Sequence, residues 1–270
     1  MAEPVRRRLV DAAWASRDVP SRVAALAAGV LHGVWLGVLT EDDLAALDER
    51  YYSSNGLYAT DEWNERGLFE WEQRLVDDVL DDGQRVLVLA AGGGREVLAL
   101  LERGFDAVGY ESHPDLARAA EDLLARRGHA GRVHVAPRDA LPDDAPAADA
   151  VIIGWGAYSL LRDRAHRVAV LAAAAARLPP GGPVLLSYLE RQEDLRRLRV
   201  TRTVANALRR VRRAAPVELG DALAPNRVHH LSPAELAAEA EAAGLVITHR
   251  AALAQVDRAT RHACAVARKR

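Results

Sequence analysis

The sequence predicts an α/β fold in which a mostly parallel sheet lies between two layers of helices, with a helical cap in front of it. Residues 85–111 read as buried strand, glycine turn, amphipathic helix and second strand in one uninterrupted run. Strand-like and helix-like segments then alternate down the chain, which is typical of parallel sheets. Residues 1–80 carry only helical patterns. We therefore expect a helical cap at 1–80 and an α/β domain at 81–270.

The composition is that of a globular protein and argues against several classes of function. Half of the 270 residues are hydrophobic, which is ample for a core. The 36 basic and 38 acidic residues nearly cancel, so the overall charge gives no reason to expect a polyanionic partner. A single cysteine, Cys264, excludes an intrachain disulfide and a cysteine metal cluster, and we predict no metal site. The cytoplasm is the expected location.

The cap is expected to contain four helices, each marked by apolar periodicity or by a start signal. They are Val5–Ser16, Val23–Thr40, Glu41–Tyr51 and Gly67–Leu80. Thr40 with an acidic residue three positions later forms a capping box for the third helix. Asp81, Asp82 and Gly83 end the fourth helix just before the first strand.

The segment Val23–Thr40 carries no formal charge and is as long as the shortest membrane spans. Four alanines, three glycines and one histidine dilute its apolar character, so we expect a buried helix and no membrane partner. Gly29, Gly33 and Gly37 share one face of this helix. That spacing allows another backbone to approach closely, in soluble cores as in membranes.

The run from Arg85 to Glu111 indicates a nucleotide site. Val86–Leu89 suits a strand buried on both faces, and three glycines follow at once. The helix that begins near Arg95 directs its first N–H groups into the same turn. A second strand ends in Glu111, whose carboxylate is placed to accept both hydroxyls of a ribose. Alone, this stretch indicates an adenosine-type ligand.

The nine residues Val86–Gly94, VLVLAAGGG, resemble the first motif of the class I S-adenosylmethionine-dependent methyltransferases. This resemblance implies a Rossmann-like three-layer sandwich with a seven-stranded sheet, an antiparallel last strand, and S-adenosylmethionine as cofactor, which leaves as S-adenosylhomocysteine. Val88 stands where the family often has an acidic residue, and Ala90 replaces the first glycine. Glu96 either supplies the missing carboxylate or only favours the helix N-terminus. The G-x-G-x-x-G spacing of dinucleotide dehydrogenases is absent.

Downstream segments continue the alternation and complete the expected sheet. The expected strands are Arg132–Ala136, Asp149–Ile153, Pro183–Leu189, Leu245–Arg250 and Arg261–Val266, and the expected helices are Pro114–Arg127, Asp163–Leu178 and Pro233–Gly244. The turn Leu178–Gly182, LPPGG, also resembles the family. Residues 191–213 hold nine arginines but no aromatic residue. We therefore expect a solvated helical insertion at about 191–226 rather than an RNA-binding element.

The resemblance implies a set of cofactor-binding residues at the carboxyl ends of the strands. In it, Asp139 contacts the adenine amino group, with the backbone of Ala140 nearby, although aspartate is also an ordinary turn residue. His113 is expected over the adenosine. The full set of expected cofactor-binding residues is Ala90, Ala91, Gly92, Gly94, Glu96, Glu111, Ser112, Asp139, Ala140, Gly154 and Trp155.

Acceptor-side candidates come from three places. Tyr51 and Tyr52 precede the first strand, in a region that often folds over the pocket in this family. Trp155 or Tyr158 could offer an aromatic face to the sulfonium. His229 or His230 could act as a general base, since imidazole titrates near neutral pH. Each of these residues has a structural alternative, namely packing between cap and sheet for the tyrosines, core packing for Trp155 and Tyr158, and a structural role for the histidines.

Together, these features predict an S-adenosylmethionine-dependent methyltransferase of a small molecule, such as a secondary metabolite, with an oxygen or nitrogen acceptor. The methyl group would move by in-line displacement, with most of the rate enhancement coming from orientation. Two alternatives remain from this resemblance, a catalytically silent S-adenosylmethionine-binding regulatory protein and, less favoured, an RNA methyltransferase. The departures at Val88 and Ala90 motivate the silent alternative.

Overall fold

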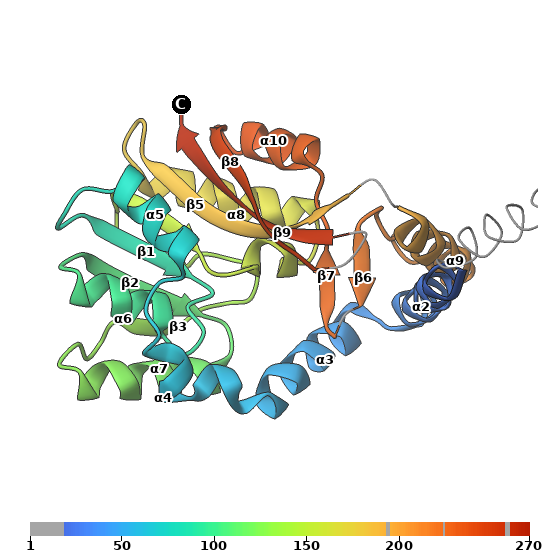
Figure 1. Cartoon of the computed structure of the whole chain (residues 1–270), viewed down its shortest axis with the longest axis horizontal. Coiled ribbons are helices and arrows are strands. Elements are labelled where there is room, and N and C mark those ends of the chain that lie inside the picture. Colours follow the sequence, from blue (N-terminus) through green and yellow to red (C-terminus); the bar gives the residue numbers. More distant parts are fainter. Residues whose placement is uncertain (1–18, 193–194, 224, 257–259) are drawn as a thin grey trace, which may run out of the picture.

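The computed structural model describes residues 19–192, 195–223, 225–256 and 260–270, and its centre is a seven-stranded sheet (Figure 1). The strand order is β3-β2-β1-β4-β5-β9-β8. The described strands of this sheet all run in one direction except β9, which is antiparallel to both β5 and β8, and this confirms the expected architecture. The strands are β1 (Arg85–Leu89), β2 (Asp106–Glu111), β3 (Val133–Val135), β4 (Ala150–Ile153), β5 (Pro183–Arg191), β8 (Leu245–Gln255) and β9 (Thr260–Lys269).

Helices cover both faces of the sheet, and β1 shows how the sequence assigns each face. Val86 and Val88 pack against one helical layer, whereas Leu87 and Leu89 pack against the other. This division follows from the two-residue alternation of side chains along a strand. The first layer consists of α5 (Glu70–Val79), α6 (Arg95–Glu102) and α7 (Pro114–Arg126). The second consists of α8 (Arg164–Arg177) and α10 (Pro233–Ala242).

The N-terminal helices pack in different places. The helix α5 places Leu75 and Val76 in the core on one face of the sheet. Outside that layer lie α2 (Val19–Val38), α3 (Glu41–Ser54), the 3-10 turn η1 (Gly56–Ala59) and the single turn α4 (Asp61–Asn64). Thr40 caps α3 through the expected box, because its side chain and that of Asp43 each accept the other's backbone N–H. The expected helix Val5–Ser16 lies outside the described residues.

The expected insertion contains α9 (Arg196–Arg212) and a small hairpin, β6 (Asp221–Leu223) with β7 (Arg227–His229). The sequence did not predict this hairpin, since its strands have only three residues each. The helices α2 and α9 lie side by side, away from the main sheet (Figure 1). Among the described residues no single helix is long and apolar enough to span a membrane, and residues 23–38 and 41–54 pass that test only as a pair bent by 120°.

Close packing of α2 on α9 depends on the three glycines of α2. A Cβ atom on Gly33 would lie 2.7 Å from the carbonyl oxygen of Thr201 and 2.7 Å from Cβ of Val204. Replacing a glycine inside a helix with alanine ordinarily stabilises it by about 0.5–1 kcal/mol. For Gly33→Ala we expect the opposite sign, a loss of about 1–3 kcal/mol in unfolding free energy, because the two backbones must separate.

Urea unfolding of the full chain measures this effect. Gly56→Ala is the matched control, since an added Cβ there meets no atom within 4 Å. A Gly33→Ala variant as stable as the parent would show that the two helices are not packed this closely.

Candidate functional site

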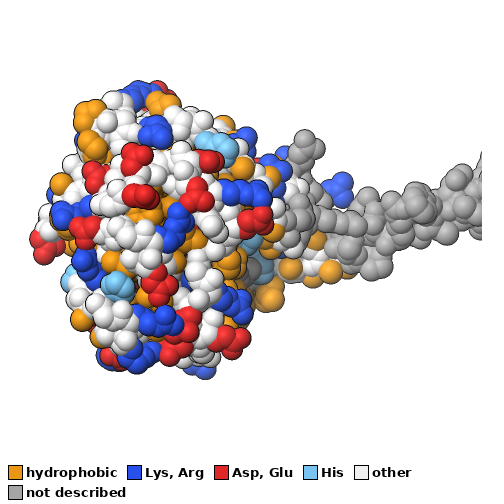
Figure 2. Space-filling model, turned by 60° about the vertical axis from the view of Figure 1, so that its left-hand side comes forward, with side chains coloured by type: hydrophobic (Ala, Val, Ile, Leu, Met, Phe, Trp, Pro, Cys, Tyr) orange, Lys and Arg blue, Asp and Glu red, His pale blue; other side chains and the backbone are white. Residues whose placement is uncertain are grey.

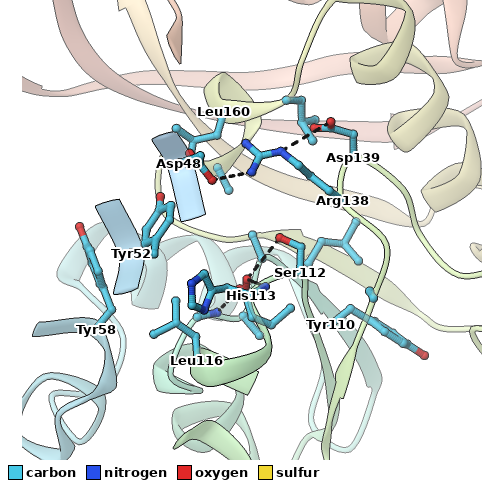
Figure 3. A pocket seen from close by; sticks show the side chains of 18 of the residues that line it. Asp48, Tyr52, Tyr58, Tyr110, Ser112, His113, Leu116, Arg138, Asp139 and Leu160 are labelled. Carbon is cyan, nitrogen blue, oxygen red and sulfur yellow. Dashed lines mark hydrogen bonds and ion pairs between the residues drawn. The ribbon is translucent and has the colours of Figure 1, made fainter. Parts of the chain in front are cut away.

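A cavity of about 590 Å³ opens at the carboxyl ends of β1, β2, β3 and β4, beneath the elements that precede the sheet (Figure 3). Its floor is formed by the residues that follow these four strands. Its outer wall is formed by α3, η1 and α4. Because the strand order reverses direction between β1 and β4, the cavity lies at the switch point where open α/β sheets bind ligands.

The turn after β1 uses backbone conformations that favour glycine. Gly92 has φ of +54° and Gly94 has φ of +93°, and Gly94 leads directly into α6. Ala90 has φ of +54°, so it adopts a left-handed conformation although it carries a Cβ. This conformation costs a non-glycine residue about 1 kcal/mol or more. The departure from the family's first glycine therefore leaves a glycine-like backbone in place.

The cap closes directly onto this turn at Gly93, a residue that the sequence analysis did not single out. A Cβ atom on Gly93 would collide with the carbonyl oxygen of Tyr58 and with Nδ2 of Asn64. Asn64 is buried, and its Nδ2 donates to the carbonyl oxygens of Tyr58 and Thr60, both at 2.9 Å. Two carbonyl acceptors fix the orientation of this amide, so its Oδ1 is left without a hydrogen-bond partner among the described residues.

Glu111 lies buried at the end of β2 and is held by backbone amides. Gly92 donates its N–H to Oε2 and His113 donates its N–H to Oε1, each at 2.7 Å. Burial raises the pKa of Glu111, and these hydrogen bonds act in the opposite direction. Each carboxylate oxygen can accept a further hydrogen bond, and Glu111 lines the cavity. The side chain can therefore accept ligand hydroxyls without releasing the glycine turn.

Beside the turn, Arg95 joins two buried carboxylates. Its Nη1 and Nη2 donate to the two oxygens of Glu72 at 2.6 and 2.7 Å, and Nη2 also donates to Oε1 of Glu96 at 2.6 Å. Burial raises the pKa of Glu72, Arg95 lowers it, and the charge of Glu96 raises it further. With both carboxylates ionised, the cluster carries one net negative charge, and Arg95 and Glu96 reach the cavity wall. Val88 is fully buried among apolar side chains and supplies no carboxylate.

Arg138 connects the outer wall to the loop after β3. Its Nη1 lies 2.5 Å from Oδ2 of Asp48 on α3, and its Nε lies 3.8 Å from Oδ2 of Asp139 (Figure 3). Asn226, in the turn between β6 and β7, donates to the other oxygen of Asp48. Asp139 has φ of +57°, and its Oδ1 accepts the N–H of Arg162 at 3.2 Å. One buried carboxylate, Asp48, therefore joins α3, the β3 loop and the insertion.

Aromatic rings line the side of the cavity next to the end of β4. The Trp155 ring lies 6.1 Å from that of Trp63 and 5.2 Å from that of Phe69, and it stacks on His262 at 5.4 Å. Tyr52 lines the cavity and lies 6.3 Å from the His113 ring (Figure 3). Trp155 is 38% exposed, so part of its ring is available to a ligand.

Most of the expected cofactor residues line this one cavity. These are Ala90, Ala91, Gly92, Glu96, Glu111, Ser112, Asp139, Ala140 and Trp155, joined by Tyr52 from the acceptor-side set. Gly94, Gly154 and Tyr51 do not line it. A Cβ on Gly154 would lie 2.7 Å from the carbonyl oxygen of Ala90, so this glycine lets the ends of β1 and β4 approach. Tyr51 packs edge-on against Tyr52 instead.

The three expected catalytic residues lie elsewhere, which corrects their predicted position. Tyr158 is fully buried and donates its hydroxyl hydrogen to Glu239 at 2.7 Å. His229 places Nδ1 2.8 Å from Oδ1 of Asp221 across the β6–β7 hairpin, and His230 places Nδ1 2.8 Å from the carbonyl oxygen of Gly220. None of the three lines the cavity, because the hairpin and α10 engage them in packing. Among the described residues, no three metal-ligand side chains converge.

No family model matches the chain. Two curated relatives, both named ribosomal protein L11 methyltransferase, come from Stenotrophomonas maltophilia strains K279a and R551-3. They are 35% and 34% identical over 118 residues, or 43% of this chain, and the match spans only 36% of each relative's length. The match therefore does not show that this chain has the activity of these relatives.

Solved structures resemble the chain over a larger part of its length. A S-adenosylmethionine-dependent methyltransferase from Methanosarcina mazei has a TM-score of 0.58 at 18% identity, covering 75% of this chain and 98% of that one. The 1,6-didemethyltoxoflavin-N1-methyltransferase of Burkholderia thailandensis, solved with 1,6-didemethyltoxoflavin and S-adenosylhomocysteine, has a TM-score of 0.57 at 20% identity, covering 86% and 91%. The CcbJ methyltransferase of Streptomyces caelestis has a TM-score of 0.57 at 18% identity, covering 82% and 99%. At these identities the comparison establishes architecture, and the chain has the Rossmann-like fold of the class I S-adenosylmethionine-dependent methyltransferases.

Proposed function

We propose that the protein binds S-adenosylmethionine in this cavity and transfers its methyl group to an oxygen or nitrogen of a small molecule. One observation carries the proposal. The glycine turn after β1, Glu111 at the end of β2 and Asp139 after β3 all line the same cavity, beneath a cap that closes on Gly93. These groups match the successive parts of an adenosine ligand, since a carboxylate accepts ribose hydroxyls and a polar loop can pair with the base edge.

The adenosine part is assigned to the β2 and β3 ends of the cavity. Glu111 accepts the ribose hydroxyls, and its hold on the Gly92 and His113 amides keeps the turn in place. His113 and Leu116 lie on the same side of the cavity and would cover the adenosine group (Figure 3). Asp139 and the backbone of Ala140 would pair with the base edge. Arg138 holds this loop against α3 through Asp48.

The methionine part is assigned to Asn64 and Glu96, because Val88 cannot serve it. A buried acceptor without a partner costs about 1–3 kcal/mol, and the ammonium group of the methionine part would satisfy Oδ1 of Asn64. The Arg95 cluster has two carboxyl groups for one guanidinium, which favours a cation beside Glu96 on the wall of the same cavity. Glu96 then acts as part of a buried pair with Arg95 rather than as an isolated carboxylate.

S-adenosylmethionine would supply the methyl group, and the residues of this chain would orient the acceptor. Trp155 and Trp63 place aromatic faces beside the end of β4, where a cation is stabilised. The acceptor would lie between these rings and α3, which contributes Asp42, Ala45 and Glu49 to the outer wall. A cavity of this size suits a small acceptor. The Burkholderia thailandensis structure, which contains a small-molecule ligand, supports the same class of acceptor. Catalysis through orientation needs no histidine base.

Calorimetry with S-adenosylhomocysteine and 5′-methylthioadenosine tests the cofactor part of the proposal. Both compounds contain the adenosine group, so both are expected to bind, and absence of binding by either would sink the assignment. Release of S-adenosylhomocysteine from labelled S-adenosylmethionine in an acceptor screen then tests turnover. Binding without turnover across small molecules would favour the silent binding protein. Methylation of a ribosomal protein instead would favour the activity in the names of the curated relatives.

The variant Asn64→Leu separates the methionine part from the adenosine part. We expect the affinity for S-adenosylhomocysteine to fall roughly tenfold to a hundredfold, because a hydrogen bond to a charged group is worth about 1.5–3 kcal/mol. The affinity for 5′-methylthioadenosine, which lacks the amino acid group, should stay unchanged. Asn206→Leu is the control, since both polar atoms of Asn206 pair with Val217 away from this cavity. Equal losses for both ligands would overturn the assignment of Asn64.

A further inference from the structure

The solvent-facing side of α2 is entirely apolar over its described side chains. Every position of α2 from 23 to 38 whose side chain is exposed carries alanine, valine, leucine or tryptophan. We call these positions the α2 stripe: Val23, Ala24, Leu26, Ala27, Val30, Leu31, Val34, Trp35 and Val38. The seven larger side chains of the stripe are 38–58% exposed. Exposed faces of helices in globular proteins normally carry charged or polar residues.

The stripe is not the face that packs on the rest of the protein. The opposite face of α2 carries Gly29, Gly33 and Gly37, which contact Val200, Val204 and Leu208 of α9. Leu36 on that side is buried with Leu44 and Ala205. Among the described residues, the packing partners of α2 therefore lie on the face opposite the stripe. Figure 2 shows charged side chains of both signs spread over the body of the molecule.

The extent of the stripe is close to that of a protein interface. It spans sixteen residues, or roughly 23 Å of helix. Its side chains leave on the order of 600 Å² of apolar surface exposed, at the upper end for a monomer and close to the roughly 800 Å² that each partner of a stable complex buries. A monomer that kept this surface in water would be prone to nonspecific association.

Charge distinguishes between the two main classes of apolar partner, a lipid bilayer and another protein. A helix that lies on an anionic bilayer carries basic side chains along the borders of its apolar face. No position of the stripe carries a basic side chain. The exposed Arg199, Arg202 and Arg210 of α9 lie about half a turn from the positions that contact α2, so they point away from α2. Arg209 and Arg212 of α9 do reach α2, but both donate to backbone carbonyl oxygens at its C-terminal end, those of Leu36, Gly37 and Val38. These two guanidinium groups therefore cap α2, and the uncharged stripe complements another uncharged stripe.

We propose that the α2 stripe binds the α2 stripe of a second copy of this chain, about a twofold axis. A twofold contact uses the same patch on both partners, so an uncharged apolar patch is complementary to itself. The two α2 helices and the two α9 helices would then form a four-helix contact that covers Trp35 and both leucines of the stripe. The valines and alanines allow the two α2 helices to approach closely.

Sedimentation equilibrium of the full chain tests this proposal. The wild-type protein is expected to sediment with the mass of two chains at micromolar concentration. Leu31→Glu should shift it to one chain, with the dissociation constant of the dimer raised at least a hundredfold, because two buried carboxylates would face an apolar contact. Thr203→Glu is the matched control, since it adds the same charge on an exposed position of α9, and it should remain dimeric.

Circular dichroism melting of each variant shows whether it is folded, and Leu31→Gln, which adds no charge, provides a second and milder disruption of the same position. A monomeric wild-type chain would overturn the proposal. So would a Leu31→Glu variant that is folded and still dimeric. Cosedimentation of a monomeric wild-type chain with phosphatidylserine vesicles, lost in Leu31→Glu, would assign the stripe to a bilayer instead.

Discussion

Glu111→Ala is expected to lower the affinity for S-adenosylhomocysteine about a hundredfold or more. Truncating one partner of buried, charge-assisted hydrogen bonds costs about 2–5 kcal/mol. The variant removes the proposed acceptor of the ribose hydroxyls and also releases the Gly92 and His113 amides, each held at 2.7 Å. Isothermal titration calorimetry measures the change directly.

Glu121→Ala is the matched control for Glu111→Ala. Glu121 also accepts backbone amides, from Arg132 and Val133 at 3.2 Å, but it does not line the cavity. It should leave the affinity unchanged. Unaltered binding by a folded Glu111→Ala variant would show that the ribose is held elsewhere.

The same carboxylate predicts the pH dependence of binding. Burial raises the pKa of Glu111 in the folded protein. Ribose hydroxyls are accepted best by the ionised form, so the affinity should fall with decreasing pH at a pH above the ordinary glutamate range. The sign for stability is opposite, because a raised carboxyl pKa means that stability falls as pH rises from the unfolded to the folded pKa. Glu111→Gln should bind weakly with no such pH dependence.

Arg167→Met is expected to lower the free energy of unfolding by about 3–5 kcal/mol. Arg167 and Glu239 are both almost fully buried, with Nη2 of Arg167 at 2.8 Å from Oε1 of Glu239. Tyr158 donates its hydroxyl hydrogen to the other oxygen. Removing the guanidinium leaves a buried carboxylate without its counter-charge, which is the costly case for ion pairs. Urea unfolding measures the loss.

Arg270→Met is the control for Arg167→Met. Arg270 pairs at 3.2 Å with the exposed Glu241, which lies on α10, the helix that also carries Glu239. An exposed pair contributes little, so its stability should barely change. The double variant Arg167→Met with Glu239→Leu should recover most of the loss, because no isolated charge remains. A loss as small as that of the control would show that water already reaches Glu239.

The sheet was predictable because its signals are local. Parallel strands buried on both faces read as continuous apolar runs, and Val86–Leu89 is such a run. The β6–β7 hairpin was not predictable, since three-residue strands leave no periodicity. The position of Glu111 has a related explanation, because the carboxyl ends of parallel strands meet at one edge of a sheet. Asp139 was singled out through the family resemblance, and both residues line the same cavity.

The remaining parts of the site depend on contacts between distant segments. Asn64 contributes because the cap folds onto Gly93, and no local pattern marks an amide whose oxygen is left unpaired. The run of three glycines was the signal in the sequence for this contact. A glycine in the middle of such a run indicates that another segment of the chain packs closely on its backbone. Tyr158 was misplaced because a buried tyrosine after a strand looks the same whether it faces a ligand or Glu239. His229 was misplaced because its partner, Asp221, lies in the hairpin that the sequence did not reveal.

Asp48 gives the cavity a thermodynamic link to a part of the chain that touches no ligand. Its two oxygens are shared between Arg138, beside the expected adenine position, and Asn226, in the turn of the small hairpin. A ligand that moved Arg138 would also change the hydrogen bond between Asp48 and Asn226. If such a ligand shifted the equilibrium between the ordered and the open turn by some factor, its affinities for the two forms of the turn would differ by the same factor. Asp48 would thereby couple the insertion to ligand binding.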